Sequence, residues 1–99
     1  MLHTVNLSPF DHNALDTCLK FATAGSALLL IEDGVYAAAA GTAVSPRIRD
    51  AMQRVPIYAL DADLRARGLH GRVMDGVRVV DYGGFVDLVT EHNAVSSWN

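Results

Sequence analysis

The chain has 99 residues, of which 51% are apolar and only 19% are charged, and its formal net charge is −3. This length fits a single domain, spanning residues 1–99, with one modest core. The acidic balance argues against a general nucleic-acid binder, because neutralising phosphates takes an excess of Lys and Arg. The apolar excess of so small a body favours association with other subunits.

The sequence also bears on the compartment. The N-terminus lacks the charged and apolar pattern of a secretory leader. The longest apolar region, residues 22–40, contains Glu32 and Asp33, which makes it a poor membrane span. The lone cysteine, Cys18, cannot form an internal disulfide. We therefore expect a protein of the reducing cytoplasm that contacts neither a membrane nor a nucleic acid directly.

The first half of the chain alternates strand and helix patterns. Five apolar residues, Ala27–Ile31, run without a polar break between turn signals, which is typical of a strand buried on both faces. Ser45-Pro46 is a typical helix start. The expected elements are a strand at 2–5, a helix from the N-cap Asp11 to about Ala24, a strand at 27–31, a short helix at 34–40 and a helix from Ser45 to about Arg54.

The second half continues the alternation. We expect a strand at 56–60, a helix at 62–67 capped by Asp61, a loop at 69–76, a strand at 77–80, a helix from Tyr82 to about His92 capped by Asp81, and a short closing strand at 94–98. Alternating elements of this kind predict βαβ units and a mainly parallel sheet. The predicted fold is a small three-layer α/β/α domain with about five strands. The apolar side of its last helix carries Tyr82, Phe85, Val86, Leu88 and Val89.

Cys18 is the only side chain that could carry sulfur without a cofactor. On a helical projection, however, the first expected helix has an apolar arc that comprises Ala14, Leu15, Cys18, Leu19, Phe21 and Ala22. Cys18 lies near the middle of this arc, and free cysteines are among the most buried residues. Two interpretations stay open: a packing cysteine, or a reactive thiol exposed where that arc meets a partner subunit.

Glu32 and Asp33 follow the central strand, at the edge where open α/β sheets gather their sites. Adjacent carboxylates could hold Mg²⁺. However, Asp33-Gly34 is also a common turn pair, and no second acidic cluster is placed to converge on it. The turn is the favoured interpretation, and a small magnesium-dependent enzyme is the alternative.

The remaining polar groups give weak signals. The four histidines lack metal-ligand spacing, and no nucleotide motif follows the first strand, so we expect neither a metal nor a cofactor. The residues 81–84, Asp-Tyr-Gly-Gly, could leave room for an anion at a helix start, or simply allow close packing. A mild basic cluster is either a solvated face or a docking patch for an acidic partner; it comprises Arg65, Arg67, Arg72 and Arg78.

A set of short sequence segments, taken together, indicates a protein family. They are residues 1–6, Ser8-Pro9-Phe10, residues 27–37, Tyr58-Ala-Leu60 with Asp63-Leu64, residues 66–68, residues 80–86 and Trp98. Together, and in the same order over almost the whole chain, they resemble the DsrH/TusB family. No single segment is specific to that family, but the set is.

The resemblance implies a DsrE-like α/β fold and membership of a heterohexameric sulfurtransferase complex. Its other chains would be DsrE-like (TusD-like) and DsrF-like (TusC-like), with two copies of each subunit. The complex would relay persulfide sulfur to a DsrC/TusE-type acceptor, with the main sulfur-carrying cysteine on the DsrE/TusD-type chain. The TusB branch serves 2-thiolation of the wobble uridine of tRNA, and the DsrH branch serves sulfur oxidation.

Cys18 matches the position of the DsrH-type cysteine, within Leu-Asp-Thr-Cys-Leu-Lys-Phe-Ala, and this favours the DsrH type over the TusB type. The resemblance therefore makes Cys18 the candidate catalytic residue, as a persulfide carrier. The alternative is a purely structural subunit of the same complex with no thiol chemistry of its own.

Overall fold

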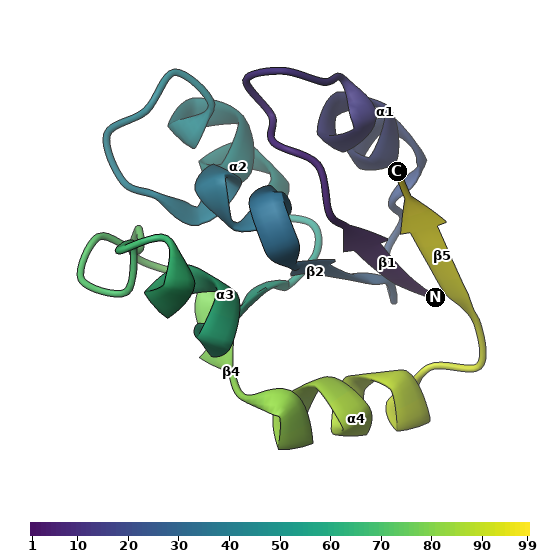
Figure 1. Ribbon diagram of the computed structural model, residues 1–99. Coiled ribbons are helices and arrows are strands. Elements are labelled where there is room, and N and C mark those ends of the chain that lie inside the picture. The colour runs from purple at the N-terminus through teal and green to yellow at the C-terminus, as the bar shows by residue number, and fades with distance from the viewer.

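The computed structural model describes residues 1–99 and contains one five-stranded sheet (Figure 1). Every neighbouring pair of strands is parallel, which confirms the expected βαβ organisation. The strands lie in the order β4-β3-β2-β1-β5, so the last strand of the chain pairs beside the first. They are β1 (Leu2–Val5), β2 (Ala27–Leu30), β3 (Ile57–Leu60), β4 (Arg78–Val80) and β5 (Val95–Trp98).

Helices cover both faces of the sheet, as the predicted three-layer fold requires. Four helical segments lie on one side and α4 (Tyr82–Glu91) lies alone on the other (Figure 1). Successive residues of a strand point to opposite faces, and the two buried clusters divide accordingly. The segments on the crowded side are α1 (Ala14–Phe21), the 3₁₀ helix η1 (Glu32–Ala38), α2 (Ser45–Ala51) and α3 (Asp61–Ala66).

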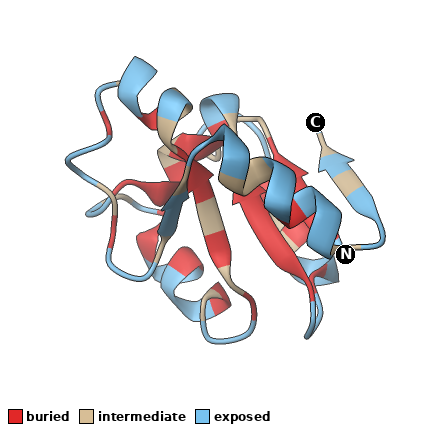
Figure 2. Cartoon of the chain, turned by 90° about the horizontal axis from the view of Figure 1, so that it is seen from below, coloured by how far each residue is buried: buried red, intermediate tan, exposed pale blue.

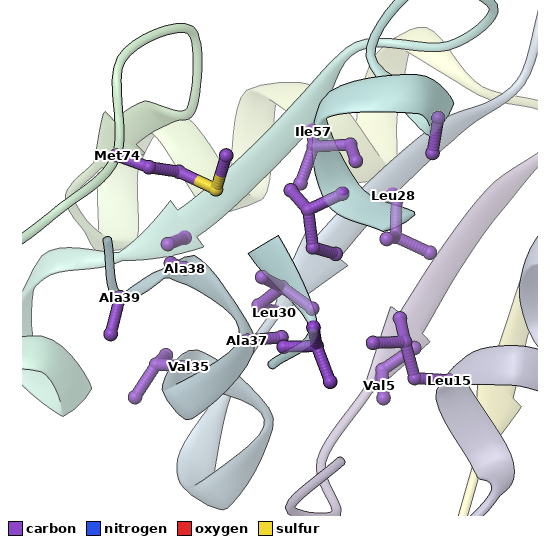
Figure 3. Packing of buried hydrophobic residues seen from close by; sticks show 14 of the residues in the cluster. Val5, Leu15, Leu28, Leu30, Val35, Ala37, Ala38, Ala39, Ile57 and Met74 are labelled. Atoms are coloured by element: carbon purple, nitrogen blue, oxygen red, sulfur yellow. The ribbon is translucent and has the colours of Figure 1, made fainter. Parts of the chain in front are cut away.

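The two faces are buried to very different extents. The crowded side holds a core of 19 buried residues, part of which is shown in Figure 3, whereas the α4 side holds only four. Figure 2 shows α4 crossing the sheet with mostly exposed residues. None of the helices combines the length and apolar character needed to cross a bilayer.

The strand β2 is the centre of the fold. All four of its residues are buried, which confirms the expectation of a strand covered on both faces. Beyond its end, Gly34 packs directly on the backbone of β1: a Cβ at this position would overlap the Val5 carbonyl oxygen. Glycine at this position therefore allows η1 to lie close to the sheet.

The start and end predicted for the first helix were wrong. It begins after Asn13, not Asp11, because the backbone N–H groups of Asp11 and His12 donate to the Ser8 carbonyl in a preceding turn. It ends at Phe21, because the backbone becomes extended at Ala22 (ψ 124°).

Other element boundaries also differ from the prediction. The segment after β2 is a 3₁₀ helix that begins at Glu32, two residues before the expected start. Ser45 is the first residue of α2, and its hydroxyl donates to the Ala39 carbonyl instead of capping the helix. Asp61 is the first residue of α3, not its cap. The cap predicted at Asp81 is confirmed, since its carboxylate accepts from the Gly84 N–H at 2.8 Å.

Candidate functional site

Cys18 lies on the inner face of α1, in the larger core. Its side chain is fully buried, together with Leu15 and Ala22 of the same apolar arc. Phe21, which the helical projection grouped with them, is 64% exposed. The arc therefore divides between the core and the surface, and the thiol is on the core side.

Burial controls the chemistry of this thiol. Desolvation raises the pKa of Cys18 from 9.0 to about 12, because the thiolate is disfavoured away from water. The thiolate is the nucleophile in sulfur transfer, and its population is very small at neutral pH. In this conformation of the chain, the Cys18 side chain is packed within the core.

The carboxylates after β2 belong to a network of structural contacts. Asp33 pairs with Arg67 of the turn after α3 at 2.8 Å, and Asp63 accepts from the backbone N–H of Glu32 at 2.7 Å. Glu32 has a positive φ of 50°, the left-handed region that few side chains adopt. The Asp63 carboxylate thus holds a strained backbone turn, consistent with the turn interpretation of Glu32-Asp33-Gly34.

These carboxylates do not form a metal-binding group. The structure contains no cluster of three or more His, Cys, Asp or Glu side chains that could hold a metal ion. The magnesium alternative therefore gains no support from the geometry.

Most of the basic cluster is engaged within the chain. Arg65 pairs with Asp61 at 2.9 Å, and Arg67 pairs with Asp33. Arg78 lies over the ring of Tyr58, with 5.7 Å between the guanidinium carbon and the ring centre. Three of the four arginines of the cluster thus have partners within the chain, and these three are distributed over α3, the following turn and β4.

The helix start at Asp81 is closed by its own cap. The Asp81 carboxylate occupies the Gly84 N–H that an anion would use. A Cβ at Gly84 would lie 2.9 Å from the Val80 Cβ, so this glycine permits close packing of α4 on the sheet. The packing interpretation therefore fits this motif better than an anion site.

One cluster was not foreseen from the sequence. The indole N–H of Trp98 donates to Nδ1 of buried His3 at 3.0 Å, and the Phe21 ring stacks on Trp98 at 5.8 Å between centroids. Burial, with a smaller contribution from the N-terminal charge, lowers the pKa of His3. The cluster ties α1 and β5 to β1; the signal in the sequence was only a histidine in a strand and an aromatic residue near the end of the chain.

Two of the three open grooves on the surface lie along helices. A polar groove of about 620 Å³ between α1 and α2 contains the ion pair between Asp16 and Arg47, with 2.6 Å between the paired atoms. An apolar groove of about 300 Å³ runs along α4 and is lined by Tyr82, Phe85, Val86, Val89 and Thr90. The second groove contains four of the five residues assigned to the apolar side of this helix. Of those five, only Leu88 is buried in the structure.

Comparison with known proteins identifies the family to which the chain belongs. A family model described as DsrH like protein matches residues 7–95. Protein TusB of Pectobacterium carotovorum subsp. carotovorum (strain PC1) is 41% identical over 98 residues, which cover 99% of this chain and 100% of that protein. Protein TusB of Escherichia coli O1:K1 / APEC is 40% identical over 100 residues, with the same coverage.

Solved structures support the fold. The crystal structure of the ychN protein from E. coli matches with a TM-score of 0.81 at 18% identity, covering 97% of each chain. A protein of unknown function from Methanobacterium thermoautotrophicum matches with a TM-score of 0.75 at 18% identity, covering 97% of this chain and 96% of the other. At these identities, the likeness establishes the architecture alone.

Fold and site together define a small parallel α/β protein whose only thiol is buried and whose second sheet face is thinly covered. The match over nearly the full length then identifies the family: the chain belongs to the DsrH/TusB family of sulfur-relay subunits.

Proposed function

We propose that this chain is a subunit of a cytoplasmic heterohexamer that relays persulfide sulfur to a DsrC/TusE-type acceptor. Its partners would be DsrE/TusD-like and DsrF/TusC-like chains. The observation that carries the proposal is the match to proteins named TusB over 99% of the chain. The exposed apolar groove on α4 is consistent with a subunit that functions in an assembly.

Within this complex we assign the chain a structural role. Persulfide transfer requires a thiolate to attack the outer sulfur of a donor persulfide, which breaks the S–S bond and releases the donor thiolate. Cys18 is fully buried, and its pKa is about 12, so it satisfies neither the access nor the charge that this step requires. The sulfur would pass through a cysteine of a partner subunit.

The alternative is that Cys18 itself accepts the persulfide. The resemblance of the sequence to the DsrH type, in which Cys18 takes the position of the family's cysteine, favours this role. For this to happen, α1 would have to move away from the core in the complex and expose the thiol.

One experiment separates the two roles. The intact complex is incubated with a persulfide donor, and each subunit is weighed by mass spectrometry under non-reducing conditions. We expect a gain of about 32 Da, one sulfur atom, on a partner chain and none on this chain. We also expect Cys18→Ser, in a complex that still assembles, to leave transfer to the acceptor unchanged. An adduct on this chain, or transfer lost from an intact Cys18→Ser complex, would establish the carrier role instead.

The destination of the sulfur is proposed to be tRNA 2-thiolation, supported by the TusB name of the full-length relatives. Sulfur oxidation is the second candidate, favoured by the DsrH-type position of Cys18. Deleting the chain's gene and measuring 2-thiouridine in total tRNA tests the first destination. Unchanged thiouridine together with loss of sulfur oxidation would select the second.

A further inference from the structure

We propose that the apolar groove along α4 docks a partner subunit through a surface with an apolar centre and a rim of Lys or Arg, and not a second copy of this chain. The inference rests on the proposed function, since it places the partner within the relay complex. It goes beyond the proposed function because it names the docking surface on this chain and the charge of the partner surface that covers it.

The first support is the exposure of apolar side chains on α4. Tyr82 and Val86 are 62% and 63% exposed, and Val89 is 39% exposed. Residues spaced by three and four lie on one stripe of a helix, so the three form a continuous strip beside Phe85. Together with Phe85 and Thr90 they line the apolar groove, which is open to solvent.

The second support is the thin cover of this side of the sheet. A single helix packs here, and Leu88 is its one buried residue. Tyr58 of β3, Val80 of β4 and Ile31, which follows β2, pack against the four-residue cluster on this side but remain only partly buried. A further layer over α4 would complete the burial of this face, just as four helical segments do on the opposite face.

The third support is the sign of the charge around the groove, which identifies the occupant. Residues 79–99 contain Asp81, Asp87 and Glu91 but no Lys or Arg. Asp87 and Glu91 are exposed on α4 itself. The preceding cation, Arg78, is held against Tyr58, with 3.4 Å from its Nη1 to the phenol oxygen.

These charges disfavour a second copy as the occupant. A two-fold contact through α4 would bring the same acidic segment of each copy together, without a cation from that segment to pair with it. A partner with a basic rim would instead gain charge pairs at the edge while its apolar centre fills the groove.

The test uses the complex co-produced with its DsrE-like and DsrF-like chains. Val86→Asp places a carboxylate in the apolar strip, and Gln53→Asp places the same charge at an exposed position after α2, on the other side of the sheet. We expect Val86→Asp to weaken assembly at least about tenfold and Gln53→Asp to leave it unchanged, by titration of labelled subunit. Circular dichroism verifies that both variants are folded.

A second variant tests the charge without touching the groove. Asp87→Asn with Glu91→Gln is expected to weaken assembly about three- to tenfold at low salt and to flatten its dependence on ionic strength. This variant removes only exposed charges, so it remains informative if Val86→Asp does not fold.

Three outcomes would overturn the inference. The first is normal assembly of folded Val86→Asp, with wild type also assembling, which leaves the proposed function intact. The second is an unchanged salt dependence in the doubly neutralised variant. The third is that analytical ultracentrifugation shows a dimer of the isolated chain, and that the Val86→Asp substitution dissociates this dimer. Failure of the wild-type chain to assemble with those partners at all would remove the proposed function as well as the inference.

Discussion

At the scale of the single residue, the Cys18 thiol lies fully buried in the larger core cluster. A lone thiol in a sulfur-relay family suggests chemistry, but this one is surrounded by the core cluster and its pKa is raised to about 12. The projection of residues 14–22 on a helix already placed it among apolar neighbours. What the projection could not tell is whether that arc faces the core or a partner, because this depends on the packing of α1 against the sheet.

The desolvated thiol should make the stability of the protein fall at high pH. Its pKa is about 12 in the folded state against 9.0 when unfolded, so between these values the folded state binds more protons. Stability therefore decreases as pH rises above 9, by up to about 1.4 kcal/mol per pH unit. Urea unfolding at pH 8, 9.5 and 10.5 measures this loss.

Cys18→Ala is the control for that measurement, because it removes the titrating group and leaves the other basic and phenolic groups in place. We expect its free energy of unfolding to depend less steeply on pH than that of wild type over the same range. Parallel curves for the two proteins would show that the thiol titrates alike in the folded and unfolded states.

At the scale of the element, the turn after β2 depends on one close contact. The backbone of η1 approaches β1 at Gly34, where no Cβ fits beside the Val5 carbonyl oxygen. Asp63 and Arg67 then hold the same turn from α3 and the residue after it. The sequence identified the turn, but these partners lie about thirty residues further on, and only the folded chain brings them together.

Gly34→Ala should therefore be strongly destabilising, by at least about 3 kcal/mol, because backbone must move to admit the methyl group. Gly71→Ala is the matched control, since a Cβ there meets nothing within 4 Å and its φ is not positive. It should change the free energy of unfolding by less than about 0.5 kcal/mol. Equal effects of the two substitutions in urea unfolding would contradict the close approach of η1 to β1.

The elements differ in how well the sequence predicts them. All five strands were expected, because alternating apolar runs and turn residues mark them locally. Helix ends were less predictable. The turn at Ser8 moves the start of α1 to a later residue than predicted. The Ser45 hydroxyl donates to the Ala39 carbonyl instead of capping α2. The apolar side of α4 was identified, but its exposure was not, because a sequence does not show how many helices share a face of the sheet.

At the scale of the whole molecule, the unequal layers predict unequal local stability. The strands β1 and β2 are buried throughout, whereas α4 has one buried residue and the edge strands β4 and β5 are largely exposed. In the isolated chain, amides of α4 should exchange with solvent through local opening that costs at least about 1–2 kcal/mol less than global unfolding. Hydrogen exchange resolved by residue tests this, and uniform protection across α4 and β2 would contradict it.

The pairing of β1 with β5 should also determine the order in which the strands form during folding. It joins residues 93 positions apart, as in the hydroxyl contact of Thr4 with Ser97, whereas β1 reaches β2 across a single helix. Closing a loop roughly fourfold longer costs about 1 kcal/mol more in chain entropy, so we expect β5 to dock after the inner strands have formed. The fluorescence of Trp98, the only tryptophan, should therefore report the docking of β5 as a late step of folding.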